Sequence, residues 1–478
     1  MSQSLKKNFV YRSILTLSTY LIGLVTFPYV SRLLGVERIG LVNFVDNTIN
    51  YFLLFATLGV NILGVREVAA AGNSVEARGR VFANILGMNL FFTLLTLAIY
   101  FVAVSAVPKL HQYAELFYVG AAKIVFSVFL VEWFFSGIED FKYITLRSVA
   151  IKMLYVGAVF LLVRAQDDYA LYFVLTVGVV VVNAVVNSIY IRRFVRFRLT
   201  DFFSRIYLKS NMALGFYAIM TSMYITFNVM FLGLVSSDTE VGYYTTAFKL
   251  YTIVLGIFSA FTTVMLPRMS ALAASDDREC FGALVEKSFS ALFTYCLPLA
   301  VCSIVLAPQI VFAFSGAGYE GAILPMRMIM GLVVVVGTAQ ILAVQVLMPM
   351  KRDRILLAAS IAGALLSVVA NVTLVSRLAS VGTALVLIFS ECAVTSVYLF
   401  YVRRNRILRF PTAVFFRNML YAAPCGVICW LCGRYVEDPF AALGASAALA
   451  GVFWLVLHTA LKTDAVMIFL KPLIARIK

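Results

Sequence analysis

The stretch VFANILGMNLFFTLLTLAIYFVAVSA (Val81–Ala106) contains no charged residue. It is longer than the roughly 20 apolar residues that carry an α-helix across a bilayer. Similar runs recur along the 478 residues, of which 62% are hydrophobic and 13% charged. Soluble domains have about 45–50% apolar residues, so the composition excludes a soluble fold. Because backbone groups in hydrocarbon must be hydrogen-bonded internally, the sequence predicts an all-α polytopic membrane protein.

Fourteen such runs, separated by short polar connections, are expected to be transmembrane helices. They cover residues 9–33, 39–65, 80–106, 113–136, 144–163, 170–191, 210–234, 243–266, 288–314, 322–348, 355–376, 380–402, 413–433 and 439–460. The short connections leave no room for a soluble domain.

The basic residues of the connections predict the orientation. If the N-terminus is cytoplasmic, the inner segments carry 28 Lys and Arg residues and the outer connections carry 6. Because Lys and Arg collect on the cytoplasmic side, both termini are expected in the cytoplasm. The formal net charge of +16 then reflects topology against an anionic leaflet. A nucleic-acid partner is not needed to explain it.

An internal repeat divides the chain. LGVERIGLVNFVDNTINY (Leu34–Tyr51) follows the first span, and SSDTEVGYYTTAFKLY (Ser236–Tyr251) follows the seventh. Six spans separate the two copies, as in a parallel repeat. We expect two pseudo-symmetric six-helix lobes, residues 1–200 and 201–402. Residues 403–478 would form two further helices and a cytoplasmic amphipathic tail.

Polar residues repeat at helical spacing inside several spans. They lie on the second span (Asn43, Asp46, Asn47, Asn50), the seventh (Tyr217, Thr221, Asn228) and the eighth (Thr245). Exposed to lipid, such faces would be costly, so we expect them to line a shared hydrated cavity. The alternative is that they connect packed helices by hydrogen bonds.

The charged residues within spans indicate the charge of the ligand. The basic ones are Arg12, Lys123, Lys152, Lys249 and Arg327, and the acidic ones are Asp46, Glu132 and Glu391. A charge at the helix centre costs about 2.5–3.5 kcal/mol on insertion scales. The excess of cations favours an anionic group, above all a phosphate. Arg12 could instead reach the inner surface. Asp46 and Glu391 are candidates for ion coupling or for a structural pair.

The sequence gives little support for an enzyme or for a metal site. Two histidines are too few for an imidazole metal site, and the seven cysteines lie mostly in apolar runs. Cys429 and Cys432 form a CxxC without a second pair, which favours packing over a metal site. No Walker loop or dinucleotide-binding glycine motif is present. We therefore expect neither a metal nor a cofactor.

The chain resembles the polysaccharide transporters of the multidrug/oligosaccharidyl-lipid/polysaccharide (MOP) superfamily, specifically bacterial flippases for lipid-linked oligosaccharides. The matching segments cover about 1–402. They are PYVSRLLG (Pro28–Gly35), ERIG (Glu37–Gly40), LGVREVA (Leu63–Ala69), EWFFSGIEDF (Glu132–Phe141), VGYYTTAFKL (Val241–Leu250), LPRMS (Leu266–Ser270), FSGAGYEGA (Phe314–Ala322), Asn371 and VGTALVLIFSE (Val381–Glu391).

The resemblance implies two lobes in a V that open alternately to each side of the bacterial inner membrane. It implies an undecaprenyl-diphosphate oligosaccharide as substrate, in O-antigen, capsule or exopolysaccharide assembly. H⁺, Na⁺ or the membrane potential would drive it, membrane lipids would surround it, and a polysaccharide polymerase and a chain-length regulator would be partners. Many relatives carry an acid near Asn228, so the amide here puts ion coupling at that position in doubt.

On this hypothesis Lys123, Lys152, Lys249 and Arg327 contact the diphosphate or acidic sugars, and Arg12 and Arg32 lie at the two entrances. The polar residues of the second, seventh and eighth spans would contact sugar hydroxyls. Three alternatives remain open: a cation-coupled multidrug exporter, a lipid II flippase, and a membrane glycosyltransferase or polymerase. The short outer connections disfavour the enzyme.

Overall fold

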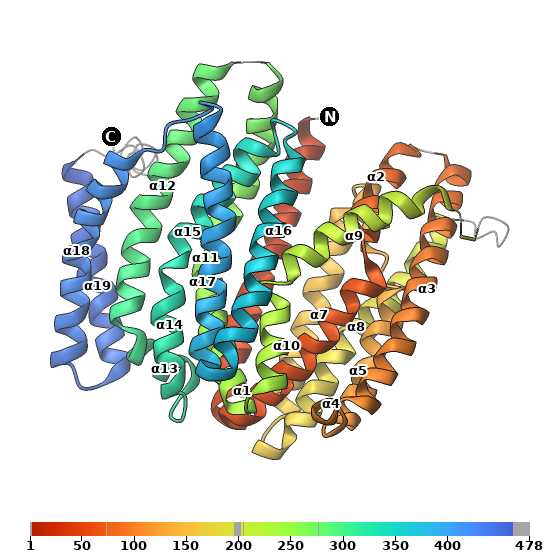
Figure 1. Ribbon diagram of the computed structural model, residues 1–478, viewed down its shortest axis with the longest axis horizontal. Helices are drawn as coiled ribbons and strands as arrows, with labels where there is room; N and C mark the ends of the chain where they lie inside the picture. Colours follow the sequence, from red (N-terminus) through yellow and green to blue (C-terminus); the bar gives the residue numbers. More distant parts are fainter. Residues whose placement is uncertain (1, 73, 196–201, 204, 276, 462–478) are drawn as a thin grey trace. The chain divides into compact units, whose positions relative to one another are not determined.

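The computed structural model describes residues 2–72, 74–195, 202–203, 205–275 and 277–461. All regular structure in these ranges is helical (Figure 1), so the chain is an all-α polytopic protein. Ten of the described helices are long and apolar enough to cross a membrane, or up to twelve if each of two bent pairs is one span. The expected number of fourteen stays a prediction. The amphipathic tail expected at the C-terminus lies outside the described residues.

The chain forms two compact units, Met1–Gly242 and Tyr243–Lys478. The expected lobes, 1–200 and 201–402, are defined by the repeat and remain a prediction. The helices of unit 1 are α1 (Ser2–Thr57), α2 (Val60–Ala70), α3 (Val75–Ala106), α4 (Pro108–His111), α5 (Ala114–Ser127), α6 (Glu132–Gly137), α7 (Phe141–Leu162), η1 (Gln166–Asp168), α8 (Tyr169–Tyr190), η2 (Ile191–Arg193), η4 (Arg205–Tyr207), α9 (Leu208–Ser222) and α10 (Thr226–Val235).

Helix α11 (Asp238–Ala274) begins in unit 1 and continues into unit 2. The other helices of unit 2 are α12 (Arg278–Val305), α13 (Ala307–Ser315), η5 (Glu320–Ala322), α14 (Ile323–Met330), α15 (Leu332–Gln340), the π-helix η6 (Ile341–Leu347), α16 (Asp353–Ala370), the π-helix η7 (Asn371–Val375), α17 (Ser376–Arg404), α18 (Thr412–Tyr435) and α19 (Pro439–Ala460).

Helix α1 is much longer than one membrane crossing, and both α1 and α17 contain a break. The apolar part of α1 extends for 48 residues, about 70 Å at 1.5 Å per residue, against a hydrocarbon core of about 30 Å. Gly35 interrupts it with φ 75°, a conformation that suits glycine because it lacks a Cβ. Helix α17 is interrupted at Ala379, φ 46°.

The pair α9–α10 packs along α1 within unit 1. The two helices meet at an angle of 55°. Near the start of α11, the backbone comes so close to Gly40 that a Cβ there would lie 1.7 Å from the carbonyl oxygen of Asp238. The ERIG segment therefore needs its glycine for this contact.

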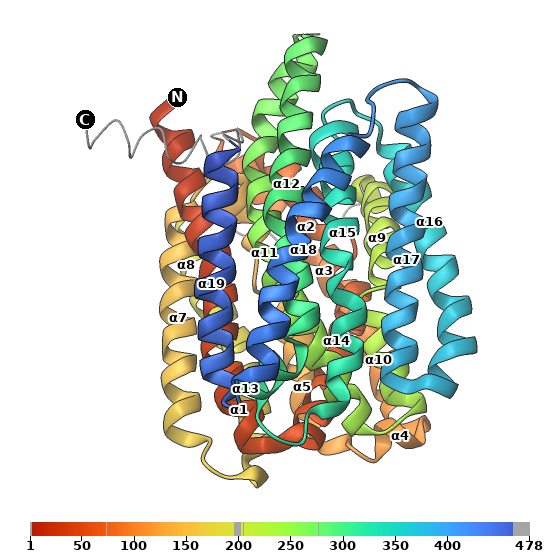
Figure 2. The ribbon, with the colours of Figure 1, turned by 90° about the vertical axis from the view of Figure 1, so that its left-hand side faces the viewer.

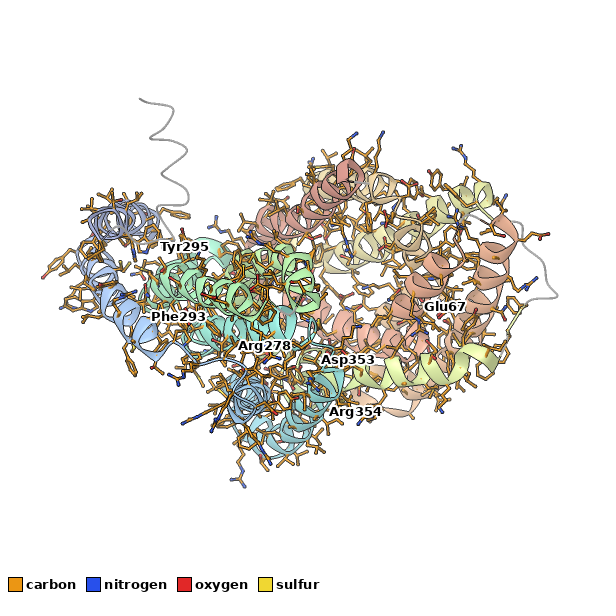
Figure 3. The ribbon with its side chains drawn as sticks, turned by 90° about the horizontal axis from the view of Figure 1, so that it is seen from above. Glu67, Arg278, Phe293, Tyr295, Asp353 and Arg354 are labelled. Carbon is orange, nitrogen blue, oxygen red and sulfur yellow. The ribbon has the colours of Figure 1, made fainter. Side chains whose placement is uncertain are left out.

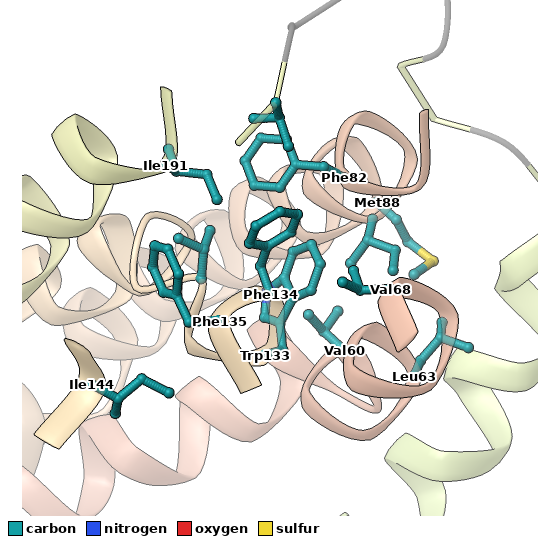
Figure 4. Close-up of a cluster of buried hydrophobic side chains, with 13 residues drawn as sticks. Val60, Leu63, Val68, Phe82, Met88, Trp133, Phe134, Phe135, Ile144 and Ile191 are labelled. Carbon is teal, nitrogen blue, oxygen red and sulfur yellow. The ribbon is translucent and has the colours of Figure 1, made fainter. Parts of the chain in front are cut away.

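An aromatic cluster holds α2, α3 and α6 together (Figure 4). Trp133 stacks on Phe82 with ring centroids 5.8 Å apart, and Phe134 and Phe135 are fully buried. The segments LGVREVA and EWFFSGIEDF, far apart in sequence, thus meet in one core.

In unit 2, α18 packs against α12 and α19 (Figures 1 and 2). Trp454 of α19 donates its indole N–H to the Thr294 carbonyl oxygen of α12 at 3.0 Å. Cys425 and Cys429 are buried against Leu306. The charged residues Arg278, Asp353 and Arg354 lie where α12 and α16 begin (Figure 3).

Candidate functional site

A buried ion pair lies at the centre of the polar face of α1. Lys123 of α5 is 6% exposed, and its Nζ lies 2.5 Å from Oδ1 of Asp46. The Lys123 ammonium also donates to Oδ1 of Asn50 at 3.4 Å, and the Asn50 amide donates to Oδ2 of Asp46 at 3.1 Å. Asp46 and Asn50 are four residues apart and therefore face α5 together. The structure brings these three sequence candidates together.

This pairing changes the charge balance expected from the sequence. The cation of Lys123 counted towards the excess of positive charge within spans, but the carboxylate of Asp46 neutralises it. Removal of either partner of a buried charge pair destabilises the fold, because the other charge is then uncompensated. Of the two roles open to Asp46, the structural pair is the one seen here.

Lys152 has a different environment. It is half-buried on α7, and its Nζ donates to the Thr19 hydroxyl of α1 at 2.6 Å. Within the described ranges it forms no ion pair with a carboxylate. Glu132 interacts with it electrostatically without forming an ion pair.

The two arginines expected at the entrances are both exposed. The Arg12 guanidinium lies over the ring of Phe141, 4.9 Å from its centroid. Arg32 lies on α1 just before the break at Gly35. The two positions are 20 residues apart on one helix, about 30 Å at 1.5 Å per residue, so they occupy opposite ends of that span.

The sequence analysis missed a second buried cation, Arg147 of α7. It is 7% exposed, its NH2 lies 2.5 Å from Oε1 of Glu132, and its NH1 donates to Oδ1 of Asn187. Tyr143 also donates to Asn187 Oδ1, at 2.9 Å. Arg147 stands at the beginning of an expected span, where basic residues are common. Glu132, the first residue of EWFFSGIEDF, is its acidic partner and was the sequence signal for a buried cation nearby.

Most other polar candidates of unit 1 bond to their own helix. The side-chain amides of Asn43 and Asn47 donate to the carbonyl oxygens of Ile39 and Asn43, both at 2.9 Å. Thr221 donates to the carbonyl oxygen of the half-buried Tyr217 at 3.1 Å. Each of these bonds uses one polar group of the donating side chain.

Asn228 lies at the bend between α9 and α10. It is fully buried, and its amide donates to the Tyr224 carbonyl oxygen at 2.8 Å. Tyr224 is in the break itself, where the helical hydrogen-bond pattern is interrupted. This position therefore supports the bend, and the structure offers no reason to place a sugar there.

The remaining candidates belong to unit 2. Thr245 is 8% exposed and Lys249 is half-buried, both on α11. Glu391 of α17 is buried, and its carboxylate has no hydrogen-bond or ion-pair partner in the described part of the chain. It interacts electrostatically with Tyr244 and Tyr251. The buried Tyr244 hydroxyl is itself without a partner among the described residues.

Arg327 lies apart from these residues, in a pocket of about 340 Å³. The pocket is also lined by Gln309 of α13 and by Trp430 and Arg434 of α18. The Arg327 Nε donates to the Ile304 carbonyl oxygen at 3.3 Å.

A third polar group of unit 1, outside the spans, was not predicted. Asp238 is 8% exposed, accepts a hydrogen bond from Tyr113 and lies 3.4 Å from the Lys109 ammonium. These bonds hold the start of α11 against the α4–α5 connection. No group of three or more His, Cys, Asp or Glu side chains that could bind a metal occurs in the described ranges.

Comparison with solved structures defines the class of protein. The lipid II flippase MurJ in an inward closed conformation matches with a TM-score of 0.77 at 14% identity, over 97% of this chain and 99% of MurJ. An inward-facing multidrug resistance MATE transporter matches with a TM-score of 0.60 at 18% identity, over 84% of this chain and 98% of that one. The fold is that of MOP superfamily transporters.

The family is shown by sequence. The model of the polysaccharide biosynthesis protein family matches residues 5–273, more than half of the chain, and the chain belongs to this family. It is 26% identical to the "Putative O-antigen transporter" of Escherichia coli (strain K12), over 85% of this chain and 98% of the relative. A relative of the same name from Shigella dysenteriae is 22% identical over 81% and 97%. The family match and the apolar helices together make the chain a multi-pass membrane protein of this family, and both of these relatives are named as transporters.

Proposed function

We propose that the protein flips undecaprenyl-diphosphate-linked oligosaccharide repeat units across the bacterial inner membrane, for O-antigen, capsule or exopolysaccharide assembly. The observation that carries the proposal is the polar face of α1, where charged and amide side chains lie at partly buried positions inside a span. Amides and carboxylates suit sugar hydroxyls, which both donate and accept hydrogen bonds. The names of the two relatives support the substrate class.

The described contacts suggest how the roles divide. Lys152 would bind the diphosphate, because its ammonium is half-buried, donates to the Thr19 hydroxyl and forms no ion pair among the described residues. Lys123 would organise Asp46 and Asn50 for sugar contacts rather than bind phosphate itself. Lys249 and Thr245 would serve the same purposes in unit 2, and Arg12 and Arg32 would attract the head group at the two ends. Arg327 is left out because it lines a different pocket.

Alternating access requires a group that changes state during the cycle. Glu391 is the candidate that we favour for H⁺ or Na⁺ coupling, because its buried carboxylate has no partner in the described chain and a phenol without a partner lies near it. Asp46 could act only if a cation or proton displaced Lys123. The membrane potential would act on either group.

The proposed setting is the inner membrane with both termini in the cytoplasm. The distribution of 28 basic residues inside and 6 outside supports this orientation. Reporter fusions after residues 110, 165 and 437 should face the periplasm, and fusions after residues 72 and 350 should face the cytoplasm. A polysaccharide polymerase and a chain-length regulator would use the product on the far side.

The test is glycan export in a strain that lacks its own flippase. The wild-type chain should restore export, and Lys152→Ala should reduce the rate at least about tenfold, since a hydrogen bond to a charged group contributes roughly 1.5–3 kcal/mol. Lys142→Ala is the matched control, because Lys142 is an exposed lysine at the start of the same helix. It should export normally.

Competing functions predict other results. Restored cell-wall synthesis in a strain depleted of its lipid II flippase, without glycan export, would replace this proposal with lipid II transport. A drug exporter would change drug tolerance on deletion and leave surface glycan unchanged. Full export by Lys152→Ala would remove that lysine from the site and leave the substrate class standing.

A further inference from the structure

Two arginines share one pocket at an end of unit 2. Arg327 comes from α14 and Arg434 from the last turn of α18, and Gln309 and Trp430 complete the lining with apolar side chains. A volume of about 340 Å³ is within the range of pockets that hold small ligands. None of the roles proposed above uses this pocket.

The protein supplies no carboxylate to these arginines. In the ranges that the structure describes, neither guanidinium forms an ion pair. The nearby Asp438 is engaged as the N-cap of α19, where it accepts from the Ala441 amide at 2.7 Å. The amide Nε2 of Gln309 donates to the Gly433 carbonyl oxygen at 3.2 Å. Two like charges without an acid are complementary to an anion.

Aromatic residues around the pocket place it at the depth of lipid head groups. Trp430 is 55% exposed, Tyr435 75% and Phe440 53%, and they lie at the end of α18 and the start of α19. Exposed Trp and Tyr residues concentrate at the membrane–water interface. The guanidinium groups beside them are therefore at the level of phosphates rather than of hydrocarbon.

A second pocket of unit 2 is apolar. It has a volume of about 440 Å³ and is lined by residues of α12, α15 and α17 and by Phe410 and Phe415. Ile304 lines the apolar pocket, and the next residue, Val305, lines the cationic one. The cationic pocket and the apolar pocket are therefore lined by neighbouring residues of α12.

We propose that this composite pocket binds an anionic phospholipid of the bilayer, with its phosphate between Arg327 and Arg434 and an acyl chain along α12. The ligand is a phospholipid because the cationic end lies at the interface and the rest is apolar. A phosphodiester without a compensating ammonium, as in phosphatidylglycerol, matches the two unpaired cations. The site gives α18 and α19 a role in lipid binding that is separate from the substrate path.

The test uses the full chain purified in detergent, with dioleoyl phosphatidylglycerol or dioleoyl phosphatidylcholine added at equal concentrations. Native mass spectrometry measures the retained lipid. A basic residue near a lipid surface contributes roughly 1 kcal/mol, which corresponds to about fivefold in affinity. Arg327→Gln or Arg434→Gln should each weaken phosphatidylglycerol binding about fivefold, and the double variant about 25-fold. Binding of phosphatidylcholine should be weak and unchanged.

Arg377→Gln is the control, because Arg377 is an exposed arginine of unit 2 that does not line the pocket. It should retain phosphatidylglycerol like the wild type. Arg434→Lys keeps the charge and should lose less than Arg434→Gln, which separates ligand binding from a general folding defect. Equal binding of both lipids, or an equal loss in Arg377→Gln, would overturn the proposal. So would binding of undecaprenyl diphosphate at this site in preference to phosphatidylglycerol.

Discussion

The two units differ in whether their charged side chains have a partner of opposite charge. In unit 1, the buried cations Lys123 and Arg147 each have an acidic partner 2.5 Å away, Asp46 and Glu132. In unit 2, Glu391 is buried with no partner for its carboxylate in the described chain, and Arg327 and Arg434 share a pocket without an acid. The two buried cations of unit 1 are thus compensated by acidic residues, whereas Glu391, Arg327 and Arg434 of unit 2 form no ion pair among the described residues.

This difference suggests which charges stabilise the fold and which do not. A buried charge with a fixed partner becomes costly only when the partner is removed. A buried charge without a partner already carries that cost, so its loss should relieve the folded state. Substitutions that leave size nearly unchanged can therefore test the comparison directly.

The largest effect is expected at Lys123. Lys123→Met should lower the free energy of unfolding by about 3–5 kcal/mol, because it leaves Asp46 as an uncompensated charge. Adding Asp46→Asn should restore most of this loss. Unfolding in mixed detergent micelles, followed by circular dichroism, would measure both. Lys152→Met, which breaks no described ion pair but removes the hydrogen bond to Thr19, should cost no more than about 1.5 kcal/mol. Equal losses for Lys123→Met and Lys152→Met would refute the compensation argument.

A smaller loss is expected at Arg147. Arg147→Leu should cost roughly 2 kcal/mol, because its partner Glu132 is half-exposed and can be hydrated after the change. Arg147→Lys should recover only part of the loss, since one ammonium cannot replace the planar guanidinium that joins Glu132 and Asn187. The same unfolding assay applies. Complete recovery by lysine would show that charge alone matters here.

Composition and periodicity were sufficient for the all-helical class, because hydropathy is a sum over many residues. Lys123, Asp46 and Asn50 were also predicted individually as polar residues within spans. Their pairing was not, because contact between α1 and α5 depends on tertiary packing, which spacing within one helix does not report. Within that site, the i, i+4 spacing that places Asp46 and Asn50 on one face of α1 was the only relation that the local sequence predicted.

Two further features of the structure, a bend and a pocket, were not predicted because their sequence signals are weak. The bend at Met223–Ile225 follows no proline, so the seventh span was expected to be continuous and Asn228 was assigned to a cavity. The pocket of Arg327 requires Arg434, more than a hundred residues later in the last two spans. Those spans resembled the family only in hydropathy, and the sequence analysis gave their residues no role.

At Glu391 we expect a change in transport without a loss of stability. Glu391→Gln should alter the free energy of unfolding by no more than about 1 kcal/mol and in the stabilising direction, because the neutral amide is less costly to bury than a carboxylate without a partner. Asp46→Asn is the matched substitution in unit 1 and should destabilise. Glycan export should become independent of external pH in Glu391→Gln if H⁺ is the coupling ion. A destabilisation equal to that of Asp46→Asn would show that Glu391 has a partner.

The smallest effect is expected for Arg434→Gln in detergent without added phospholipid. The side chain is exposed and forms no ion pair among the described residues, so its loss should change the free energy of unfolding by less than about 0.5 kcal/mol. With phosphatidylglycerol added, the wild type should gain stability and the variant should gain less, because a ligand stabilises only the state that binds it. A difference that is already present without lipid would mean that Arg434 stabilises the end of α18 directly, through the carbonyl groups of its last turn. In that case the charges of unit 2 would be compensated within the protein after all, and the contrast between the two units would rest on Glu391 alone.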